Sequence, residues 1–378
     1  MAKLGEVCKV SPSTKNIERQ GAWLLNLDMV EQQTGRVIEY KYVGEDDLNG
    51  SIIQFDTENV LYSKLRPNLN KVVLPPKDGF STSELLPLRP DASVLNKDYL
   101  AAFLRSDSFV TWAVSKTAGA KMPRLGTKDL MNAEIPVPSI EQQKKIAEKF
   151  KKLEQLISLR KQQLAKLDEL VKARFVEMFG TFPANPFRWD TGKIQDVVSD
   201  VRYGSSRPAV EGGKYPYLRM NNITYSGELD LRDTKRIDIP DSELDKCTVR
   251  RGDVLFNRTN SKELVGKTCV YNRDELMVLA GFVIRVRVNE RIRPEVLSAF
   301  LNMDFSKRML IGMCKTAIGQ ANINAKELQN IDLYIPPIEL QDQFVTLKNK
   351  IDQQKQTVQQ SLEKLELMKK ALMQEYFG

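Results

Sequence analysis

The chain has 378 residues, and its 57 Lys and Arg against 49 Asp and Glu give a formal net charge of +8. At about 100–200 residues per domain, this length predicts two or three domains. The sequence contains no His, which excludes Ser-His-Asp and Cys-His nucleophiles, a His general base and His metal ligands. The four Cys residues lie far apart, which predicts free buried thiols and no zinc site.

Apolar runs in the sequence are short. The longest, Leu276 to Ile284, falls well below the roughly 18–20 residues that a membrane helix needs. The N-terminus lacks the apolar core of a signal peptide. We therefore expect a cytoplasmic protein with no membrane partner. The mildly basic charge is compatible with a nucleic-acid partner but does not by itself indicate one.

Residues 1–137 predict a mixed α/β globular part. Apolar runs bounded by turn residues predict strands at Gly50–Phe55, Asn59–Ser63 and Lys71–Leu74. A later amphipathic pattern predicts one helix from Asn96 to Ala113. Between the second and third strands, Lys, Arg and Asn side chains form a polar cluster.

Residues 138–180 predict a long helix. Pro138 stands just before the segment, where proline is favoured, and no Gly or Pro follows until Gly180. Apolar residues then recur every three or four positions, a heptad pattern typical of a coiled coil. At about 1.5 Å per residue, a helix from Ser139 to Val176 would be about 57 Å long.

Residues 181–335 predict a second mixed α/β part. We expect strands at Tyr215–Met220 and Cys247–Asn257. The apolar segment Leu276–Val288 predicts a strand pair or one long strand. Pro294–Met309 has the spacing of an amphipathic helix.

The remaining residues, 336–378, repeat the first helical segment. Glu141 corresponds to Glu339, an offset of 339 − 141 = 198 positions that continues without a gap to Gly180 and Gly378. Over the 53 positions that begin at Lys128, 18 residues are identical between the two copies. The repeat predicts two divergent globular parts, each followed by a related helix. Two such helices pair most simply in antiparallel fashion. The molecule would then have pseudo-two-fold symmetry, and the helix pair would set the distance between the two globular parts.

Additional apolar residues widen the helical stripe beyond a two-helix seam. They are Leu156, Leu159, Leu170 and Leu367. This width predicts a further helical partner that covers them. A plain intramolecular helix pair is the simpler interpretation of the same pattern.

The candidate binding residues lie mainly in loops that follow the predicted strands, at matching places in the two globular parts. Arg can bond to two acceptors of guanine, Asn can bridge the edge of adenine, and Lys and hydroxyl groups contact phosphates. A solvated polar loop is the alternative for any single residue. The candidate residues are Lys64, Arg66, Asn68, Asn70, Lys71, Lys121, Arg124, Tyr203, Ser205, Ser206, Arg219, Asn221, Asn222, Asn257, Arg258, Thr259, Asn260, Ser261, Lys262 and Lys267.

The sequence carries no catalytic motif that we recognise. Gly266-Lys267-Thr268 resembles the end of a P-loop, but Ser261 stands where that motif requires its first Gly. No Gly-rich turn indicates a dinucleotide or S-adenosylmethionine site. We therefore predict a non-catalytic chain without a cofactor or metal of its own.

With these features, the chain resembles the DNA-specificity subunits of type I restriction-modification systems. Residues 135–143 and 335–341, at the start of the two helical segments, carry the most specific part of the resemblance. Gly252–Arg258 and Leu264–Lys267 resemble that family's target-recognition domain. The first globular part departs from it, with Thr57-Glu58-Asn59 in place of Gly-Asp-Val.

The resemblance implies an α+β fold of two target-recognition domains, residues 1–137 and 181–335. Two helical spacers, 138–180 and 336–378, would form an antiparallel coiled coil between them. Each domain would read one half of a bipartite, asymmetric target in double-stranded DNA. The spacers would set the gap between the halves and dock two methyltransferase subunits, which bind S-adenosylmethionine and carry the adenine-flipping site. Restriction/translocase subunits would join through those.

Three other functions are weighed against this one. A specificity subunit of another restriction-modification type would share the architecture and differ only in its partners. A coiled-coil scaffold that binds protein is a second alternative, against which the duplicated basic loops speak. A stand-alone enzyme is the third, and the absence of His and of nucleotide motifs disfavours it.

Overall fold

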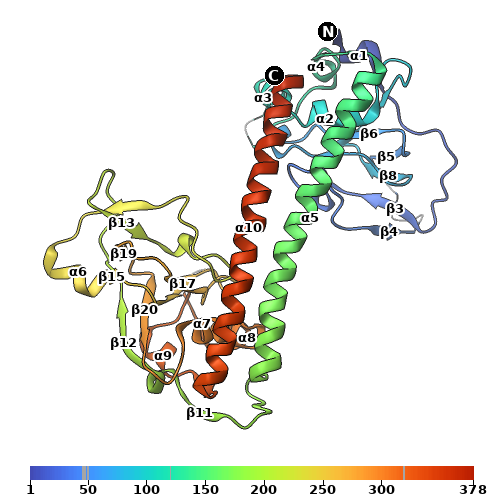
Figure 1. Ribbon diagram of the computed structural model, residues 1–378. Helices are drawn as coiled ribbons and strands as arrows, with labels where there is room; N and C mark the ends of the chain where they lie inside the picture. Colours follow the sequence, from blue (N-terminus) through green and yellow to red (C-terminus); the bar gives the residue numbers. More distant parts are fainter. Residues whose placement is uncertain (45–47, 49–50, 120, 318–319) are drawn as a thin grey trace. The chain divides into compact units, whose positions relative to one another are not determined.

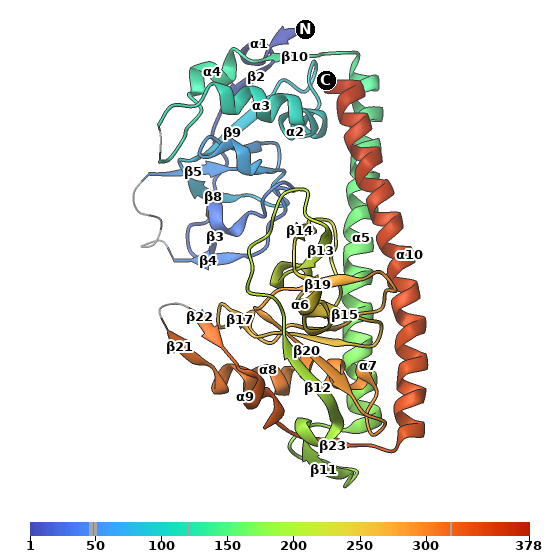
Figure 2. The same cartoon turned by 90° about the vertical axis from the view of Figure 1, so that its left-hand side faces the viewer.

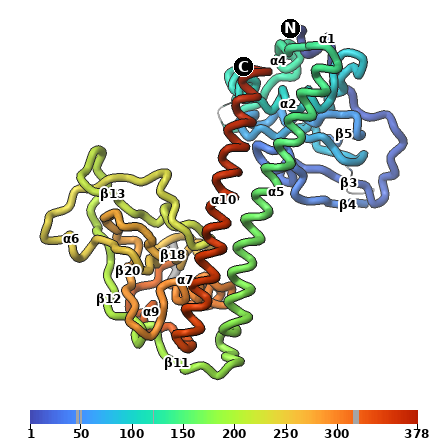
Figure 3. The backbone as a smooth tube through the Cα atoms, viewed as in Figure 1, coloured from blue at the N-terminus to red at the C-terminus, as the bar shows by residue number. Residues whose placement is uncertain are grey.

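The computed structural model describes residues 1–44, 48, 51–119, 121–317 and 320–378. The chain forms two compact units. Unit 1 comprises Met1–Lys161 and Gln360–Gly378, and unit 2 comprises Gln162–Gln359. Two helices of 40 residues each, α5 (Ile140–Phe179) and α10 (Ile338–Phe377), run through both units, as Figures 1 and 3 show. The fourfold division of the chain predicted above remains a proposal.

Two four-stranded sheets form the described globular part of unit 1, in the orders β2-β9-β6-β7 and β4-β3-β8-β5. The pair β3–β8 is parallel, and the other pairs of these two sheets are antiparallel. A separate ladder, β1–β10, joins the two ends of this globular part. The elements are β1 (Ala2–Lys3), α1 (Leu4–Val7), β2 (Cys8–Val10), β3 (Ala22–Leu25), η1 (Leu27–Met29), β4 (Lys41–Val43), β5 (Ile52–Phe55), β6 (Val60–Ser63), η3 (Pro67–Leu69), β7 (Val72–Val73), β8 (Gly79–Thr82), β9 (Leu85–Pro90), α2 (Lys97–Leu104), α3 (Asp107–Ser115), α4 (Thr127–Met131) and β10 (Glu134–Ile135).

Unit 2 repeats this topology. Its two four-stranded sheets have the orders β12-β20-β16-β18 and β14-β13-β19-β15, with β13–β19 as the parallel pair. A three-stranded sheet, β17-β22-β21, follows the end of β16. The elements are β11 (Asp190–Lys193), η4 (Ile194–Val197), β12 (Val198–Tyr203), β13 (Tyr215–Leu218), η5 (Met220–Asn222), β14 (Lys235–Ile237), α6 (Asp241–Cys247), β15 (Thr248–Val249), β16 (Val254–Asn257), β17 (Thr259–Asn260), β18 (Thr268–Val270), β19 (Met277–Leu279), β20 (Val283–Val288), α7 (Pro294–Asn302), α8 (Asp304–Met313), β21 (Lys315–Ala317), β22 (Gln320–Asn322), α9 (Ala325–Gln329) and β23 (Asp332–Ile335).

The largest core of each unit lies between one sheet, its two following helices and the long helices. In unit 1, apolar residues of β6, β9, α2 and α3 contact Ile146 and Phe150 of α5 and Phe377 of α10. In unit 2, residues of β16, β20, α7 and α8 contact Phe179 of α5 and Phe344 of α10. Each globular part is therefore fixed to the helix segments of its own unit by buried apolar surface, the dominant favourable term in folding.

Within each unit, α5 and α10 run antiparallel. In unit 1 the ring of Phe150 stacks 5.8 Å from that of Phe377 near the C-terminal end of α10. In unit 2 the ring of Phe175, near the end of α5, lies 5.5 Å from that of Phe344, near the start of α10. The predicted antiparallel helix pair is confirmed. Among the described residues, no helix has an apolar stretch long enough for a bilayer.

Two helices that the sequence predicts as single are each interrupted. The segment Asn96–Ala113 forms α2 and α3, because the hydroxyl of Ser106 accepts the Phe109 N–H at 3.3 Å and starts a new helix. The segment Pro294–Met309 is divided at Met303, whose extended backbone ends α7 before α8 begins.

The strand predictions also divide. Leu276–Val288 contains two strands, β19 and β20, as one of the two alternatives had it. The segment Cys247–Asn257, expected as one strand, holds β15 and β16 around a turn in which Gly252 has φ of 90°. Gly50, the first residue of a predicted strand, lies outside the described residues.

A buried glutamine joins each long helix to its globular part. In unit 1, Gln143 of α5 is 0% exposed. Its side-chain oxygen accepts the N–H of Asn96, the residue that caps α2, at 2.8 Å. Its nitrogen donates to the carbonyl oxygens of Val94 and Pro138, each at 2.8 Å. Three backbone groups at the helix junction are thereby satisfied by one side chain.

Gln341 of α10, 198 positions later, makes the same three bonds in unit 2. It is also 0% exposed and accepts the N–H of Arg293, which precedes α7, at 2.8 Å. It donates to the carbonyls of Arg291 at 3.0 Å and Pro336 at 2.8 Å. The Gln that recurs in the two helical repeats is therefore a structural clamp between helix and globular part.

Candidate nucleic-acid interface

In unit 2, the end of β16 carries an arginine held by backbone bonds on both sides. The N–H of Arg258 donates to the carbonyl of Phe282 at 3.0 Å, and its carbonyl accepts the N–H of Ile323 at 2.9 Å. Its guanidinium lies over the ring of Tyr203, 4.8 Å from the ring centroid. The Tyr203 hydroxyl in turn accepts the N–H of Ala325 at 2.8 Å. This stack positions a planar cation next to a ring that is 41% exposed.

The residues after Arg258 form a short edge sheet. Thr259 and Asn260 of β17 pair with Asn322 and Ala321 of β22. Figure 2 shows β17, β22 and β21 beside one another within this unit. Thr259 is buried, and Asn260 is half-buried. The next two candidates differ in exposure, since Ser261 is half-buried and Lys262 is exposed.

Several polar atoms at this edge are buried without a partner among the described residues. They are Nδ2 of Asn257, Nε of Arg258 and Oδ1 of Asn322. Asn257 itself is 0% exposed. Buried polar groups in folded proteins are nearly always hydrogen-bonded, so three unpartnered atoms within one strand junction mark a place that a bound group could complete.

Two lysines among the candidates are used inside the protein. Lys267 donates through Nζ to the carbonyl of Met220, the first residue of η5, at 2.9 Å. Lys71 donates to the carbonyl of Leu27, the first residue of η1, at 2.5 Å. Burial lowers the pKa of both ammonium groups, although Asp28 opposes this at Lys71. Each lysine holds the same 3₁₀ turn in its own unit.

Among the candidates around η5, some side chains bond within the protein and one is exposed. Asn222 is buried, accepts the N–H of Arg219 at 2.9 Å and donates to the carbonyl of Asp230 at 2.8 Å. Arg219 donates to the carboxylate of Asp233 at 2.9 Å. Asn221 is exposed. Two of these three side chains therefore organise the turn.

The two serines after β12 lie in different environments. Ser205 is 4% exposed, and its N–H donates to the carbonyl of Leu279 at 2.6 Å. Its hydroxyl accepts the N–H of Arg207 at 3.2 Å. Ser206 is exposed. Ser205 thus joins β12 to the second sheet, and Ser206 is the serine that faces outward.

In unit 1, the segment after β6 lies against residues 123–125. Leu65 forms a backbone bridge with Arg124, and the N–H of Arg66 donates to the carbonyl of Pro123 at 2.8 Å. The Arg124 guanidinium pairs with Glu84 at 2.9 Å. Arg66 and Lys121 are exposed, and Lys64 is half-buried. The structure therefore brings the segment of Lys64 and Arg66 next to Arg124, while Lys121 lies in the same loop as Arg124.

The remaining candidates of unit 1 lie in η3 and after it. Asn68 is exposed, and its carbonyl accepts from the Gln33 side chain at 2.9 Å. Asn70 is 7% exposed, has φ of 49° and donates to the carbonyl of Arg105 at 3.0 Å. Asn70 is thus a turn residue, because Asn tolerates the left-handed conformation better than most residues.

The sequence did not predict a cluster of aromatic and cationic side chains beside β4, which consists of Tyr40, Tyr42 and Lys77. Lys77 places Nζ 4.2 Å from the ring centroid of Tyr42 and 5.0 Å from that of Tyr40. Both rings are exposed, by 57% for Tyr42 and 46% for Tyr40. The alternation Tyr40-Lys41-Tyr42 was the available signal, because alternate residues of a strand share one face. Phe282, 55% exposed beside Arg258, was also missed.

No group of three or more Cys, Asp or Glu side chains in the described part of the chain is arranged to hold a metal ion. The four Cys thiols are free, and those of Cys8, Cys247 and Cys269 are buried. Burial raises the pKa of Cys8 and of Cys269 to about 12, so neither is a thiolate at neutral pH.

Comparison with known proteins agrees with this geometry. The family model for the type I restriction modification DNA specificity domain matches residues 1–169 and 186–367. The type I restriction enzyme EcoKI specificity subunit of Escherichia coli K12 is 25% identical over 276 residues, which are 68% of this chain and 59% of that subunit. The chain therefore spans less than two thirds of that relative's length.

Solved structures share the fold. A chain in a structure of the type I R-M system superposes with a TM-score of 0.58 at 19% identity, covering 100% of this chain and 96% of the other. The type I restriction-modification system S subunit from M. genitalium gives a TM-score of 0.57 at 14% identity, covering 100% and 95%. The family model covers both globular parts and most of both helices, and the chain belongs to the type I restriction modification DNA specificity domain family.

Proposed function

We propose that this chain is the sequence-specific DNA-binding subunit of a restriction-modification complex. It would read a bipartite, asymmetric target in double-stranded DNA, with one half assigned to each globular part. One observation carries the proposal. In both units the chain leaves the equivalent strand, β6 or β16, and presents cationic side chains at the same topological position.

In unit 2 we assign base contact to the Arg258–Tyr203 stack and to the half-buried side chain of Asn260, and we leave out Asn257, because it is 0% exposed and cannot reach a base. The guanidinium already lies in a fixed plane over Tyr203, so little side-chain freedom is lost when it binds. Arg is the side chain that bonds best to the two acceptors of guanine, and Asn to adenine. Lys262 is exposed beyond this edge and would contact phosphate.

In unit 1 the corresponding group comprises Lys64, Arg66, Lys121 and Arg124. Arg66 and Lys121 are exposed and supply charge toward the DNA backbone. Arg124 is paired with Glu84, which would have to release it or orient it at the interface. The candidates that bind backbone groups of their own unit, such as Lys71 and Lys267, are left out of this proposed interface.

The partners of the chain follow from its exposed helix surface. Leu156, Leu159, Leu367 and Met368 on the helices of unit 1 are exposed by 44%, 58%, 69% and 53%. Large apolar side chains of this kind mark contact surfaces for other proteins. We assign them to methyltransferase subunits, two per chain, which would bind S-adenosylmethionine, with restriction/translocase subunits attached through them. The chain itself would be a non-catalytic cytoplasmic component.

The test is a binding selection with the assembled complex. The chain is purified with its methyltransferase subunits and used to select duplexes from a random DNA library. The proposal predicts enrichment of two short sequences separated by a gap of fixed length. Enrichment of a single uninterrupted sequence would contradict the bipartite reading. Absence of DNA binding by an intact complex would favour a protein-binding scaffold.

A further inference from the structure

In unit 2, an exposed phenylalanine lies directly opposite Arg258. β16 pairs Asn257 with Val283 of β20, and the N–H of Arg258 then donates to the carbonyl of Phe282 at 3.0 Å. The ladder therefore continues one residue beyond the end of β16. Residues directly opposite in an antiparallel pair carry neighbouring side chains on one face. Because Phe282 is 55% exposed, an apolar ring accompanies the cation at the proposed DNA interface.

Backbone bonds fix the turn that carries this phenylalanine. The N–H of Gly281 donates to the carbonyl of Ser205 at 2.7 Å, and the N–H of Val283 donates to the carbonyl of Ala280 at 2.9 Å. A Cβ at Gly281 would lie 3.2 Å from the Ser205 carbonyl oxygen, so the turn lies close to the end of β12. The turn therefore holds Phe282 in a defined place, as a specificity contact requires.

Unit 1 has a carboxylate at the corresponding position. The N–H of Lys64, the first residue after β6, donates to the carbonyl of Glu84 at 3.1 Å, and the register of β6 with β9 continues to this pair. Glu84 therefore occupies the place of Phe282. Its carboxylate accepts two bonds from the guanidinium of Arg124, at 2.9 Å from Nη2 and 3.4 Å from Nε.

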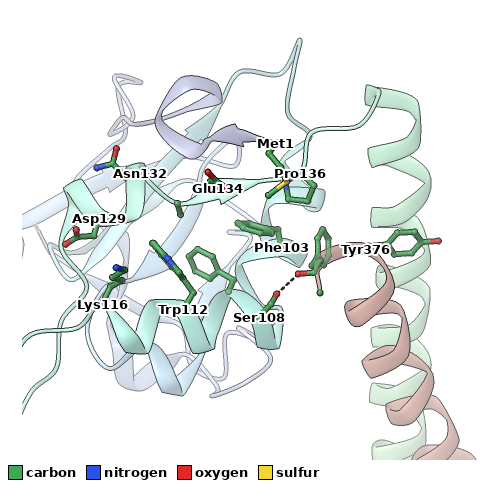
Figure 4. Close-up of a pocket in the computed structure, with 14 residues that line it drawn as sticks. Met1, Phe103, Ser108, Trp112, Lys116, Asp129, Asn132, Glu134, Pro136 and Tyr376 are labelled. Atoms are coloured by element: carbon green, nitrogen blue, oxygen red, sulfur yellow. Dashed lines mark hydrogen bonds between the residues drawn. The ribbon is translucent and has the colours of Figure 1, made fainter.

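A second backbone bond supports the correspondence between the two positions. The carbonyl of Arg258 accepts the N–H of Ile323, and the carbonyl of Lys64 accepts the N–H of Leu125, each at 2.9 Å. Leu125 and Ile323 lie 198 positions apart, and each leads into a short helix, α4 or α9. Figure 4 shows α4 at the labelled Asp129. The two positions therefore share their backbone bonds and differ in the side chain that faces outward.

Phenylalanine and glutamate suit different bases. In the major groove, thymine presents a 5-methyl group, which Phe contacts as an apolar surface. Cytosine presents an N4 amino group, which donates to a carboxylate, and the neighbouring arginine of each unit can donate to N7 and O6 of guanine. In unit 1 the bonds between Arg124 and Glu84 hold a donor and an acceptor side by side. That arrangement matches the guanine and the cytosine of one base pair.

We propose that this position selects one base in each half of the target, thymine through Phe282 and cytosine through Glu84. The inference rests on the DNA-binding function proposed above and deepens it, because it names the base that each unit prefers at one place. Arg258 binds a guanine next to the thymine. Arg124 binds the guanine that pairs with the cytosine, and it keeps its bonds to Glu84 when DNA is bound.

The first test removes single methyl groups from the DNA. The half-site of unit 2 is the one that Arg258→Ala relaxes. Each thymine of that half is replaced in turn by deoxyuridine, which lacks only the 5-methyl group, and binding of the complex with its methyltransferase subunits is followed by fluorescence anisotropy. One replacement should weaken wild-type binding about fourfold, the value of one buried methyl group, and binding of the Phe282→Ala variant less than about 1.5-fold. Equal losses in the two proteins, or no loss at any thymine, would overturn the proposal.

Phe187→Ala is the matched control for this experiment. Phe187 is also an exposed phenylalanine of unit 2, at 48%, and it lies in the segment between α5 and β11. The control variant should keep the loss of about fourfold at the same thymine. A control that becomes insensitive to the methyl group as well would refute the assignment to Phe282.

The second test concerns unit 1 and uses selection of duplexes from a random library. Glu84→Gln keeps the size of the side chain but adds a donor, so it should relax the preference for cytosine at one position of the other half-site. Glu58→Gln changes a carboxylate of the same unit that is 59% exposed, and it should leave both halves unchanged. If Glu84→Gln raises the affinity for all duplexes equally, Glu84 acts only by repelling phosphates, and its role in base selection is refuted.

Selection with the wild-type complex shows whether the function or the base assignment is wrong. If that complex selects no bipartite motif, the proposed function and the inference built on it both fail. If it selects such a motif, and both Phe282→Ala and Glu84→Gln leave every base preference unchanged, the function stands and the base assignment is wrong.

Discussion

In unit 1, β6 ends at Ser63 and the chain continues as a loop against residues 123–125. In unit 2, β16 ends at Asn257 and the chain continues into the sheet β17-β22-β21. Around this difference the two units keep the same strand orders, the same buried glutamine and the same lysine on a 3₁₀ turn. The two units therefore share one arrangement of strands and helices and differ in the segment that follows β6 or β16. This is the arrangement expected of two modules that read different sequences.

The turn before β6 and the turn before β16 are closed in the same way, although their residues differ. Asn59 accepts the N–H of Asp56 at 3.0 Å, and Asp253 accepts the N–H of Arg250 at 2.9 Å, each closing the turn before its strand. The Asn in unit 1 was a departure from the family pattern, yet it performs the same bond. Such turns need a side-chain oxygen rather than a particular residue.

The largest expected effect concerns Gly35, which has φ of 67° and lies where a Cβ would come within 1.7 Å of the Val72 carbonyl. Gly35→Ala should destabilise unit 1 by about 3–5 kcal/mol, because it combines a strained backbone with a clash. Gly21→Ala is the matched control. That glycine has φ of 69° and no atom within 4 Å of the added Cβ, so only about 1–2 kcal/mol should be lost. Urea unfolding followed by circular dichroism measures both, and equal losses would refute the clash.

The next effect tests the glutamine clamp. Gln341→Leu leaves one N–H and two carbonyls of the α7–α10 junction without their buried partner. We expect a loss of about 2–3 kcal/mol in the free energy of unfolding. Gln343→Leu, at an exposed position two residues along the same helix, should change stability by less than about 0.5 kcal/mol. If both variants unfold at the same urea concentration, the clamp is not a determinant of stability.

The third prediction compares Arg258, which we place at the DNA interface, with Lys267, which binds a backbone carbonyl inside the protein. Arg258→Ala should weaken binding of the selected duplex by about 1–3 kcal/mol and relax one half-site. Lys267→Met should leave DNA affinity and its salt dependence unchanged, because that ammonium donates to the Met220 carbonyl. Fluorescence anisotropy across a salt series measures both variants. A weaker salt dependence in the folded Lys267 variant would reassign that lysine to phosphate contact.

The smallest effect is a pH dependence that is larger in unit 2 than in unit 1. Burial, aided by Lys172 and Lys267, lowers the pKa of Lys307 to about 7, and its Nζ donates to the Gly266 carbonyl at 2.6 Å. Because the unfolded chain binds this proton up to about pH 10.5, the stability of unit 2 should rise between pH 7 and pH 10, by about 1–2 kcal/mol. Lys307→Met should flatten the rise. Unit 1 has Val110 in the corresponding position of α3, and an equal rise in that unit would contradict the assignment.

The fold was largely predictable because the sequence repeats itself. The heptad spacing and the 198-position offset indicated two long helices and two related globular parts, and the structure has them. The breaks within the predicted helices were harder to predict. Ser106 and Met303 fall inside continuous amphipathic patterns, and the periodicity alone does not show that one helix ends and another begins there.

The candidate site was predictable in place but not in detail. The position after each strand end was visible in the sequence, and Arg258 lies there. The sequence could not distinguish Lys262 from Lys267, because the carbonyl that binds Lys267 comes from Met220, 47 residues away. The cluster of Tyr40, Tyr42 and Lys77 was missed for the same reason, since Lys77 is distant in sequence from the two rings.

The central claim is that each unit reads its own half of one DNA target. Its most direct test is to express the chain with its methyltransferase subunits in a host without adenine methylation and to map modified adenines across the genome. The account predicts a bipartite motif with a fixed gap, in which Arg258→Ala relaxes only one half and Arg66→Ala lowers methylation of the whole motif without relaxing either half. Relaxation of both halves by Arg258→Ala, or a motif without a gap, would contradict it.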